Sequence, residues 1–206
     1  MGRDRDVGAF DRRAPTYDEG YLGQMHRDIA ARTIVLALAA RPEPGRVLDV
    51  GCGTGVALRE LAERLPRARR LIGVDAAAGM VEVARERLGD NRIEVVQGKA
   101  EALPVESGAF DLVISITSFD HWGDQGAGLR ECARALTPSG VFVLTDLFSP
   151  LLAPTMVIGR RGRARTRRAG AELLRRAGLV EQQWHGGFLI RTVVASARPP
   201  EAETSL

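Results

Sequence analysis

The sequence predicts a single α/β domain with a doubly wound, seven-stranded, mostly parallel sheet and one antiparallel strand near the C-terminus. Three observations support this prediction. Seven short runs rich in Val and Ile are mostly separated by helix-like segments, which is typical of βαβ units. The glycine-rich stretch 51–55 stands between the first run and the next helix. The length of 206 residues suits one hydrophobic core.

The chain begins with a polar stretch and continues into a helix. Residues 1–20 are expected to form a mobile N-terminal segment. Residues 21–40 carry apolar side chains at helical spacing, and the sequence Arg-Pro-Glu-Pro-Gly then ends the helix. We expect one folded domain over residues 21–198 and a frayed tail over residues 199–206.

The remaining elements alternate along the chain. The predicted elements between residues 46 and 146 are strands at 46–50, 71–75, 92–98, 110–116 and 140–146, with helices at 56–65, 80–88 and 129–136. A helix over 166–177 is expected to end at Gly178. The last two strands, 179–185 and 188–197, flank Gly186-Gly187, which predicts a hairpin and an antiparallel strand.

Composition narrows the classes of protein. The longest apolar run, 33–40, is too short to span a bilayer, and the first residues lack the apolar core of a signal peptide, so a cytoplasmic protein is predicted. Cys52 and Cys132 lie far apart and fit neither a disulfide framework nor a zinc site. No metal is therefore predicted.

Arginine supplies almost all of the positive charge, since Lys99 is the one lysine in the sequence. Residues 159–168 contain six arginines. This run is interpreted either as a solvated loop or as a binding site for an anionic group of a substrate. Arg160 is the residue of this run that is predicted to bind the substrate. Nucleic acid is not favoured, because no aromatic residues are interleaved with the arginines.

The stretch Gly51-Cys-Gly-Thr-Gly55 indicates a nucleotide-like ligand. Glycines let a ligand lie against the main chain and permit positive φ, and the following helix points its positive end at the ligand. The glycines could also serve helix packing alone. Asp75 ends the second strand, where a carboxylate suits the two hydroxyls of a ribose. The spacing G-x-G-x-G differs from the dinucleotide pattern G-x-G-x-x-G and weakens the case for NAD(P).

These motifs resemble the class I S-adenosylmethionine-dependent methyltransferases, in particular the small type similar to ubiquinone and menaquinone biosynthesis methyltransferases. The resemblance runs through five segments, FDRRAPTYD (10–18), VLDVGCGTG (47–55), GVDAAAGM (73–80), GKAEALPVESGAFDLVIS (98–115) and LRECARALTPSGVFVLTD (129–146). It implies a Rossmann-like fold, S-adenosylmethionine as the cofactor and S-adenosylhomocysteine as the product.

The resemblance also implies positions for the cofactor. Its methionine part would lie along Asp49, Gly51, Cys52 and Gly53, and Asp75 would hold the ribose. The remaining predicted cofactor contacts are Ala76, Met80, Ala100, Glu101, Ser115, Ile116 and Tyr17, the last in a segment that looks like the N-terminal lid of the family. Met80 could equally be a core residue, and Tyr17 a surface aromatic.

One position departs from the family. Lys99 stands where an acid often accepts a hydrogen bond from the adenine amino group. An ammonium group cannot accept, so this contact is lost, moves to Glu101 or comes from the backbone.

The acceptor side is predicted from the stretch SFDHWGD (118–124), which follows the fourth strand. His121 is the candidate general base, with His26 and His185 as further candidates, although it could simply shape the pocket. Phe119, Trp122 and Tyr21 could form an aromatic wall or belong to the core. The predicted function is methyl transfer to a small molecule, aromatic or anionic, by a monomer or homodimer that binds neither nucleic acid nor membrane. A noncatalytic cofactor-binding protein and an NAD(P)-dependent oxidoreductase are the alternatives.

Overall fold

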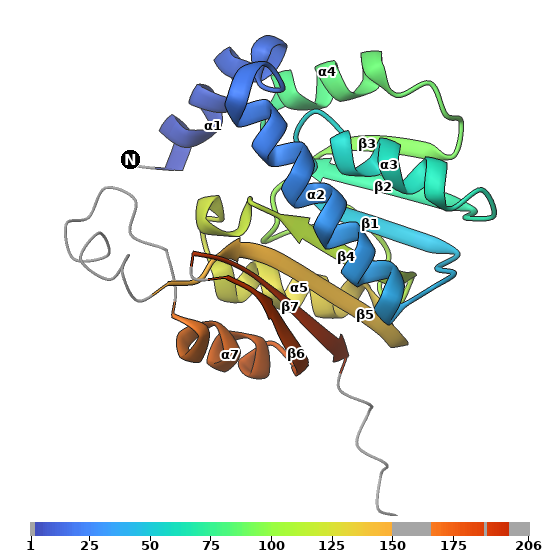
Figure 1. Cartoon of the computed structure of the whole chain (residues 1–206), viewed down its shortest axis with the longest axis vertical. Coiled ribbons are helices and arrows are strands. Elements are labelled where there is room, and N and C mark those ends of the chain that lie inside the picture. The colour runs from blue at the N-terminus through green and yellow to red at the C-terminus, as the bar shows by residue number, and fades with distance from the viewer. Residues whose placement is uncertain (1–2, 150–165, 188, 198–206) are drawn as a thin grey trace, which may run out of the picture.

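The computed structural model describes residues 3–149, 166–187 and 189–197. Its centre is a seven-stranded sheet in the order β3-β2-β1-β4-β5-β7-β6, with helices on both faces (Figure 1). The strands are β1 (Arg46–Val50), β2 (Arg70–Asp75), β3 (Ile93–Gln97), β4 (Phe110–Ile116), β5 (Leu136–Leu147), β6 (Leu179–Gly186) and β7 (Ile190–Ala197). Strand β7 runs antiparallel to both of its neighbours, and the other pairings are parallel. The predicted fold is confirmed.

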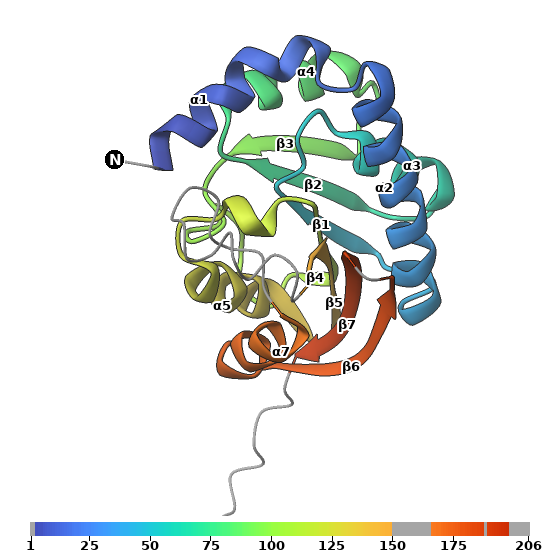
Figure 2. The ribbon, with the colours of Figure 1, turned by 60° about the vertical axis from the view of Figure 1, so that its left-hand side comes forward.

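Two layers of helices bury the two faces of the sheet. One layer is formed by α2 (Gly20–Ala40), α3 (Val56–Arg64) and α4 (Ala78–Arg87), and the other by α5 (Gln125–Ala135) and α7 (Arg167–Arg176) (Figure 2). Alternate strand residues belong to opposite cores: Val47 packs with the first layer and Leu48 with the second. This alternation follows from the two-residue period of a strand, and it explains why the strands are apolar on both faces.

Some elements begin or end away from their predicted bounds. Helix α5 starts at Gln125, one turn before the predicted Leu129, because the carboxylate of Asp124 caps it by accepting from the backbone N–H of Ala127 at 2.9 Å. The cap precedes the apolar positions that were used to predict the helix. The predicted end of the helix that precedes Gly178 is confirmed, since this glycine has φ of +81°.

The N-terminal segment, residues 3–19, contains regular structure that apolar periodicity did not predict. It forms α1 (Arg3–Arg13) and a 3-10 helix, η1 (Ala14–Thr16). Ala14 is buried against Ala77 and Met80, next to partly buried Phe10 and Tyr17. The segment thus lies over α4 at the edge of the sheet, as Figure 2 shows.

Parts of the predicted chain lie outside the described residues: the tail 199–206, residue Phe188, and the arginines at 160, 161, 163 and 165. Within the described part of the chain, no helix is long and apolar enough to cross a membrane.

Candidate functional site

A cavity of about 510 Å³ opens at the carboxyl ends of β1, β2 and β4. The strand order reverses between β1 and β4, and ligands of open α/β sheets bind at such a switch point. The volume lies within the range of about 300–1,000 Å³ that is usual for small-molecule sites. The fold therefore places a ligand site where the glycine-rich stretch was predicted to provide one.

The three glycines of this stretch have positive φ, and each has a different role. A Cβ on Gly51 would lie 2.2 Å from Oγ of Ser118, and one on Gly55 would lie 2.5 Å from Leu88, so both glycines allow close packing. Gly53, with φ of +52°, has no heavy atom within 4 Å of its Cβ position and lines the cavity. The close-packing alternative therefore describes Gly51 and Gly55, whereas Gly53 leaves bare main chain toward a ligand.

The hydroxyl of Ser118 explains why residue 51 lacks a side chain. It donates to the carbonyl oxygen of Val50 at 2.9 Å and accepts from Nε1 of Trp122 at 3.2 Å. Ser118 thus joins the end of β1 to the segment after β4, and it fixes the indole of Trp122 at the cavity.

Asp75 lines the cavity at the end of β2. Its Oδ2 accepts from the backbone N–H of Gly53 at 2.8 Å, and its Oδ1 accepts from that of Ala77 at 2.9 Å. Burial raises the pKa of Asp75, and the two backbone bonds oppose that rise. The carboxylate thus orients the glycine-rich stretch, and each oxygen keeps a further lone pair toward a ligand.

Asp49 is the electrostatic exception of the site. It is buried at the base of the cavity, and its Oδ1 has no hydrogen-bond partner among the described residues. Burial, followed by repulsion from Asp75, raises the pKa of Asp49 to about 8. Asp49 lines the cavity, and a cationic group such as the ammonium group of an amino-acid moiety beside it would offset the cost of burying its ionised form.

The other predicted cofactor residues divide into lining and buried positions. Those that line the cavity with Asp49, Gly51, Gly53 and Asp75 are Tyr17, Cys52, Ala76, Met80, Ala100, Glu101 and Ile116. Lys99 lies among them, and Oε1 of Glu101 accepts from the backbone N–H of Asp124 at 2.7 Å. Ser115 is fully buried beneath the lining, where its hydroxyl bonds to that of Ser118 at 2.9 Å.

Five rings line the cavity, and we call the part of the lining that they form the acceptor end: Phe10, Tyr17, His26, His121 and Trp122. Tyr17 stacks on His26 with ring centroids 5.1 Å apart, and Phe10 contacts His121 edge-on at 4.9 Å. Burial raises the pKa of Tyr17 and lowers that of His26, so both are neutral near pH 7.

His121 reaches the cavity from a 3-10 helix, η2 (Phe119–His121), just after β4. Its Nε2 lies 3.2 Å from Oδ1 of Asp120, and its side chain is 40 % exposed. Behind this pair, Asp146 accepts from the backbone N–H of Phe119 at 2.8 Å. Burial and the neighbouring Asp120 raise the pKa of Asp146 to about 7.

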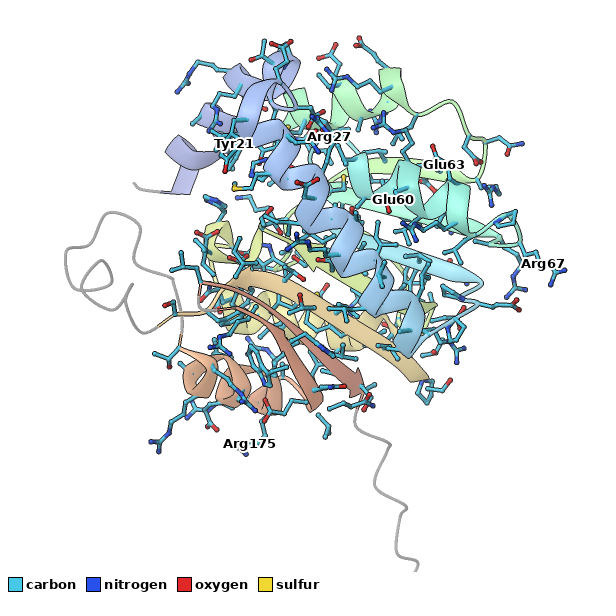
Figure 3. All side chains as sticks on the ribbon, in the orientation of Figure 1. Tyr21, Arg27, Glu60, Glu63, Arg67 and Arg175 are labelled. Atoms are coloured by element: carbon cyan, nitrogen blue, oxygen red, sulfur yellow. The ribbon has the colours of Figure 1, made fainter. Side chains whose placement is uncertain are left out.

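Three predicted acceptor-side residues are not brought together with His121. Tyr21, labelled in Figure 3 near the start of α2, is 84 % exposed and does not line the cavity. Phe119 is buried between Trp122 and Phe148, so it belongs to the core. His185 lies in β6, away from the cavity lining, and Arg160 lies outside the described residues.

Sequence reasoning missed several lining residues, including Phe10, Asp18, Thr54 and Thr117. Phe10 and Asp18 stand in the FDRRAPTYD stretch and Thr54 in GCGTG, so their motifs were noticed but not these side chains. Thr117 has φ of +51°, which is uncommon for a residue other than glycine, and nothing in the sequence signals it.

The lining is rich in carboxyl groups: Asp18, Asp49, Asp75, Glu101 and Asp124. Among the described lining residues, Lys99 alone carries a fixed positive charge. Such a lining favours a ligand with cationic groups, and S-adenosylmethionine has a sulfonium and an ammonium group. Together with the orphaned oxygen of Asp49 and the open main chain at Gly53, this charge distribution fits that cofactor.

The fold and the site define a nucleoside-binding Rossmann-like domain, and comparisons with known proteins identify its family. Residues 47–140 match the family model described as a methyltransferase domain. The chain is 34% identical over 169 residues to the malonyl-[acyl-carrier protein] O-methyltransferase of Geobacter sulfurreducens, covering 78% of this chain and 62% of that protein. It is 33% identical over 142 residues to the demethylmenaquinone methyltransferase of Thermotoga maritima, covering 68% and 61%.

A solved structure shares the fold. A chain of the Haloferax volcanii complex between the Trm112 methyltransferase activator and a methyltransferase superposes with a TM-score of 0.77 at 23% identity, covering 92% of this chain and 97% of that one. The protein belongs to the class I S-adenosylmethionine-dependent methyltransferases, and the predicted family is confirmed. The chain spans about three fifths of the length of these two curated relatives.

Proposed function

We propose that this protein transfers a methyl group from S-adenosylmethionine to a small-molecule acceptor. The observation that carries the proposal is the single cavity lining that joins the open main chain at Gly53, the orphaned carboxyl oxygen of Asp49 and an aromatic end with His121. Cofactor and acceptor could therefore meet in one enclosed space.

The residues of the cofactor end have separate tasks in this proposal. Asp49 binds the ammonium group, Asp75 accepts from the ribose hydroxyls, and Ala76 and Met80 pack against the base. The bound cofactor supplies an activated methyl group on a sulfonium sulfur. The protein then contributes mainly by alignment and exclusion of water, which can lower a barrier by about 7–11 kcal/mol in well-aligned reactions.

His121 is the proposed general base for an acceptor that must lose a proton. Its Nε2 lies close to the carboxylate of Asp120, which stabilises the imidazolium once the proton has been taken up. His121 would take up the proton that the acceptor atom loses as it receives the methyl group, and S-adenosylhomocysteine would be the other product.

Phe10, Tyr17 and Trp122 favour a flat, apolar acceptor. The carboxyl-rich lining favours a neutral or cationic group over an anionic one, and an anionic acceptor would depend on arginines outside the described residues. The two relatives are named for malonyl-[acyl-carrier protein] and demethylmenaquinone. An acceptor attached to a carrier protein is therefore the alternative to a free small molecule.

Calorimetry with S-adenosylhomocysteine tests the proposal. We expect saturable binding to the wild type, binding at least tenfold weaker in Asp75→Ala, and no binding of NADH or NADPH. Methyl transfer is then measured with radiolabelled cofactor against flat phenols and amines, with malonyl-carrier protein as the comparison. Equal binding by wild type and Asp75→Ala, or stabilisation by NADPH alone, would refute the assignment.

A further inference from the structure

The carboxylate of Asp18 joins three parts of the molecule that are distant in sequence. Its Oδ2 accepts from Oγ1 of Thr54 at 2.7 Å, in the glycine-rich stretch. The same oxygen accepts from Nη1 of Arg87 at 2.6 Å, at the end of α4. One oxygen atom thus ties the N-terminal segment both to the glycine-rich stretch and to the end of α4.

Further bonds hold the segment in the same place. Nη2 of Arg87 donates to the carbonyl oxygen of Pro15 at 3.1 Å. Oδ1 of Asp11 accepts from the backbone N–H of Gly79 at 2.8 Å and so caps α4, whose N-cap residue Ala77 makes no side-chain cap bond. Nη1 of Arg27, labelled in Figure 3, donates to the carbonyl oxygen of Asp18 at 2.7 Å.

The segment reaches from these bonds to the acceptor end. Tyr17 is the residue before Asp18, and its ring stacks on His26. Phe10, which lies in α1 seven residues before Tyr17, contacts the ring of His121. A change in the position of the glycine-rich stretch would therefore be transmitted through Thr54 and Asp18 to two of the rings that enclose the acceptor.

We propose that Asp18 is a positioning residue that couples occupation of the cofactor end to the placement of Phe10 and Tyr17 over the acceptor end. The carboxylate is well suited to this coupling. Its side chain is 17% exposed, and its two partners are a hydroxyl and a guanidinium, so its hydrogen bonds are charge-assisted and fixed in direction. Cofactor affinity and order of the segment must then change together, since coupling between two sites is reciprocal.

The packing around Asp18 supports a fixed rather than a chance contact. Gly23 follows on the first turn of α2, and a Cβ there would overlap the carbonyl group of Asp18. Thr54 is 4% exposed, so its hydroxyl has few alternatives to the carboxylate. Both partners of the side chain and the space for its backbone are therefore built into the fold.

The inference rests on the proposed function and is tested with the whole chain and S-adenosylhomocysteine as the probe. Hydrogen exchange of residues 7–17 is measured with and without this probe, beside its affinity by calorimetry. The variants are Asp18→Asn and Thr54→Val, singly and combined. Glu94→Gln is the matched control. It breaks the ion pair between Nη2 of Arg70 and Oε2 of Glu94, which are 2.6 Å apart. Both residues lie near the amino ends of their strands, β2 and β3, whereas the cavity lies at the carboxyl ends.

In the wild type, the probe should slow exchange in residues 7–17. Each single variant should lose this ligand-dependent slowing and bind the probe about tenfold more weakly, and the double variant should be no worse than either single one, because both remove the same link. The control variant should behave as the wild type.

Two results would overturn the coupling. One is that Asp18→Asn and Thr54→Val both keep the ligand-dependent slowing of exchange and bind the probe with an affinity within about twofold of the wild type. The other is additive losses in the double variant, which would mean that the two side chains act separately. Both leave the proposed function intact, whereas failure of the wild type to bind the probe refutes the function itself.

Discussion

Asp49 should release a proton when the cofactor binds. The burial that raises its pKa to about 8 leaves the carboxyl group mostly protonated at pH 7 in the free protein. An ammonium group beside this carboxyl group favours the ionised form. If binding lowers the pKa of Asp49 by two units or more, between about half a proton and one proton leaves for each molecule bound at pH 7.

The sign of the pH dependence follows directly. Because the bound state holds fewer protons than the free state, binding becomes tighter as the pH rises, by up to about tenfold per pH unit below 8. Above pH 8 the free carboxyl group is already ionised, and the contribution of Asp49 levels off. A shift of two units corresponds to about 2.7 kcal/mol of interaction between carboxylate and ammonium.

Calorimetry of S-adenosylhomocysteine binding at pH 7, in buffers with different ionisation enthalpies, measures the proton count. Asp49→Asn is the control, since it lacks the titrating carboxyl group while the free ligand and its amino group are the same in both experiments. We expect the wild type to release between about half a proton and one proton more than the variant for each molecule bound. Equal proton release from both proteins would show that Asp49 does not meet the ammonium group.

Three further predictions concern stability and catalysis. Because the folded-state pKa of Asp146 is raised to about 7, the free energy of unfolding should fall as the pH rises from 5 to 8, by at most ~1.4 kcal/mol per unit from this group, and Asp120→Asn should reduce that fall in urea titrations; an unchanged fall would rule out the repulsion. Gly51→Ala should destabilise the fold by about 1–3 kcal/mol in the same assay, since its Cβ would overlap a hydroxyl at positive φ, while Gly89→Ala, with open space around it, should change stability by less than ~1 kcal/mol. His121→Gln should lower kcat by about 10²–10⁴-fold and leave S-adenosylhomocysteine affinity within twofold, and full activity in the variant would exclude it as the base.

The sheet and the cofactor end could be predicted from the sequence because they depend on local patterns. The runs 46–50 and 110–116 were predicted with their observed bounds, since short apolar runs between turn-forming residues are characteristic of buried strands. Gly53 lies three residues after the end of β1, Asp75 is the last residue of β2, and parallel strands bring their carboxyl ends to one edge of the sheet. Local sequence order therefore determines where these residues meet.

The acceptor end depends on contacts between distant segments, and no local pattern encodes them. Tyr21 and Tyr17 are four residues apart, yet Tyr21 is exposed and Tyr17 faces the cavity, because α2 begins between them at Gly20 and changes the direction of the chain. Phe119 and His121 share one short helix and point to opposite sides of it, into the core and into the cavity. Knowing the motif did not give the orientation of these side chains.

The two ends of the cavity therefore carry different kinds of constraint. The cofactor end is formed by strand ends and the turn beside them, where Gly51 must pack against Ser118 and Asp75 must reach the backbone of Gly53. The acceptor end is closed by Phe10 and Tyr17, which come from a segment held by side-chain bonds such as those of Asp18. Substitutions in that segment can change which acceptor fits without disturbing the sheet, because the segment lies outside it. This arrangement gives a physical reason why relatives of similar sequence can be named for different substrates, malonyl-[acyl-carrier protein] and demethylmenaquinone.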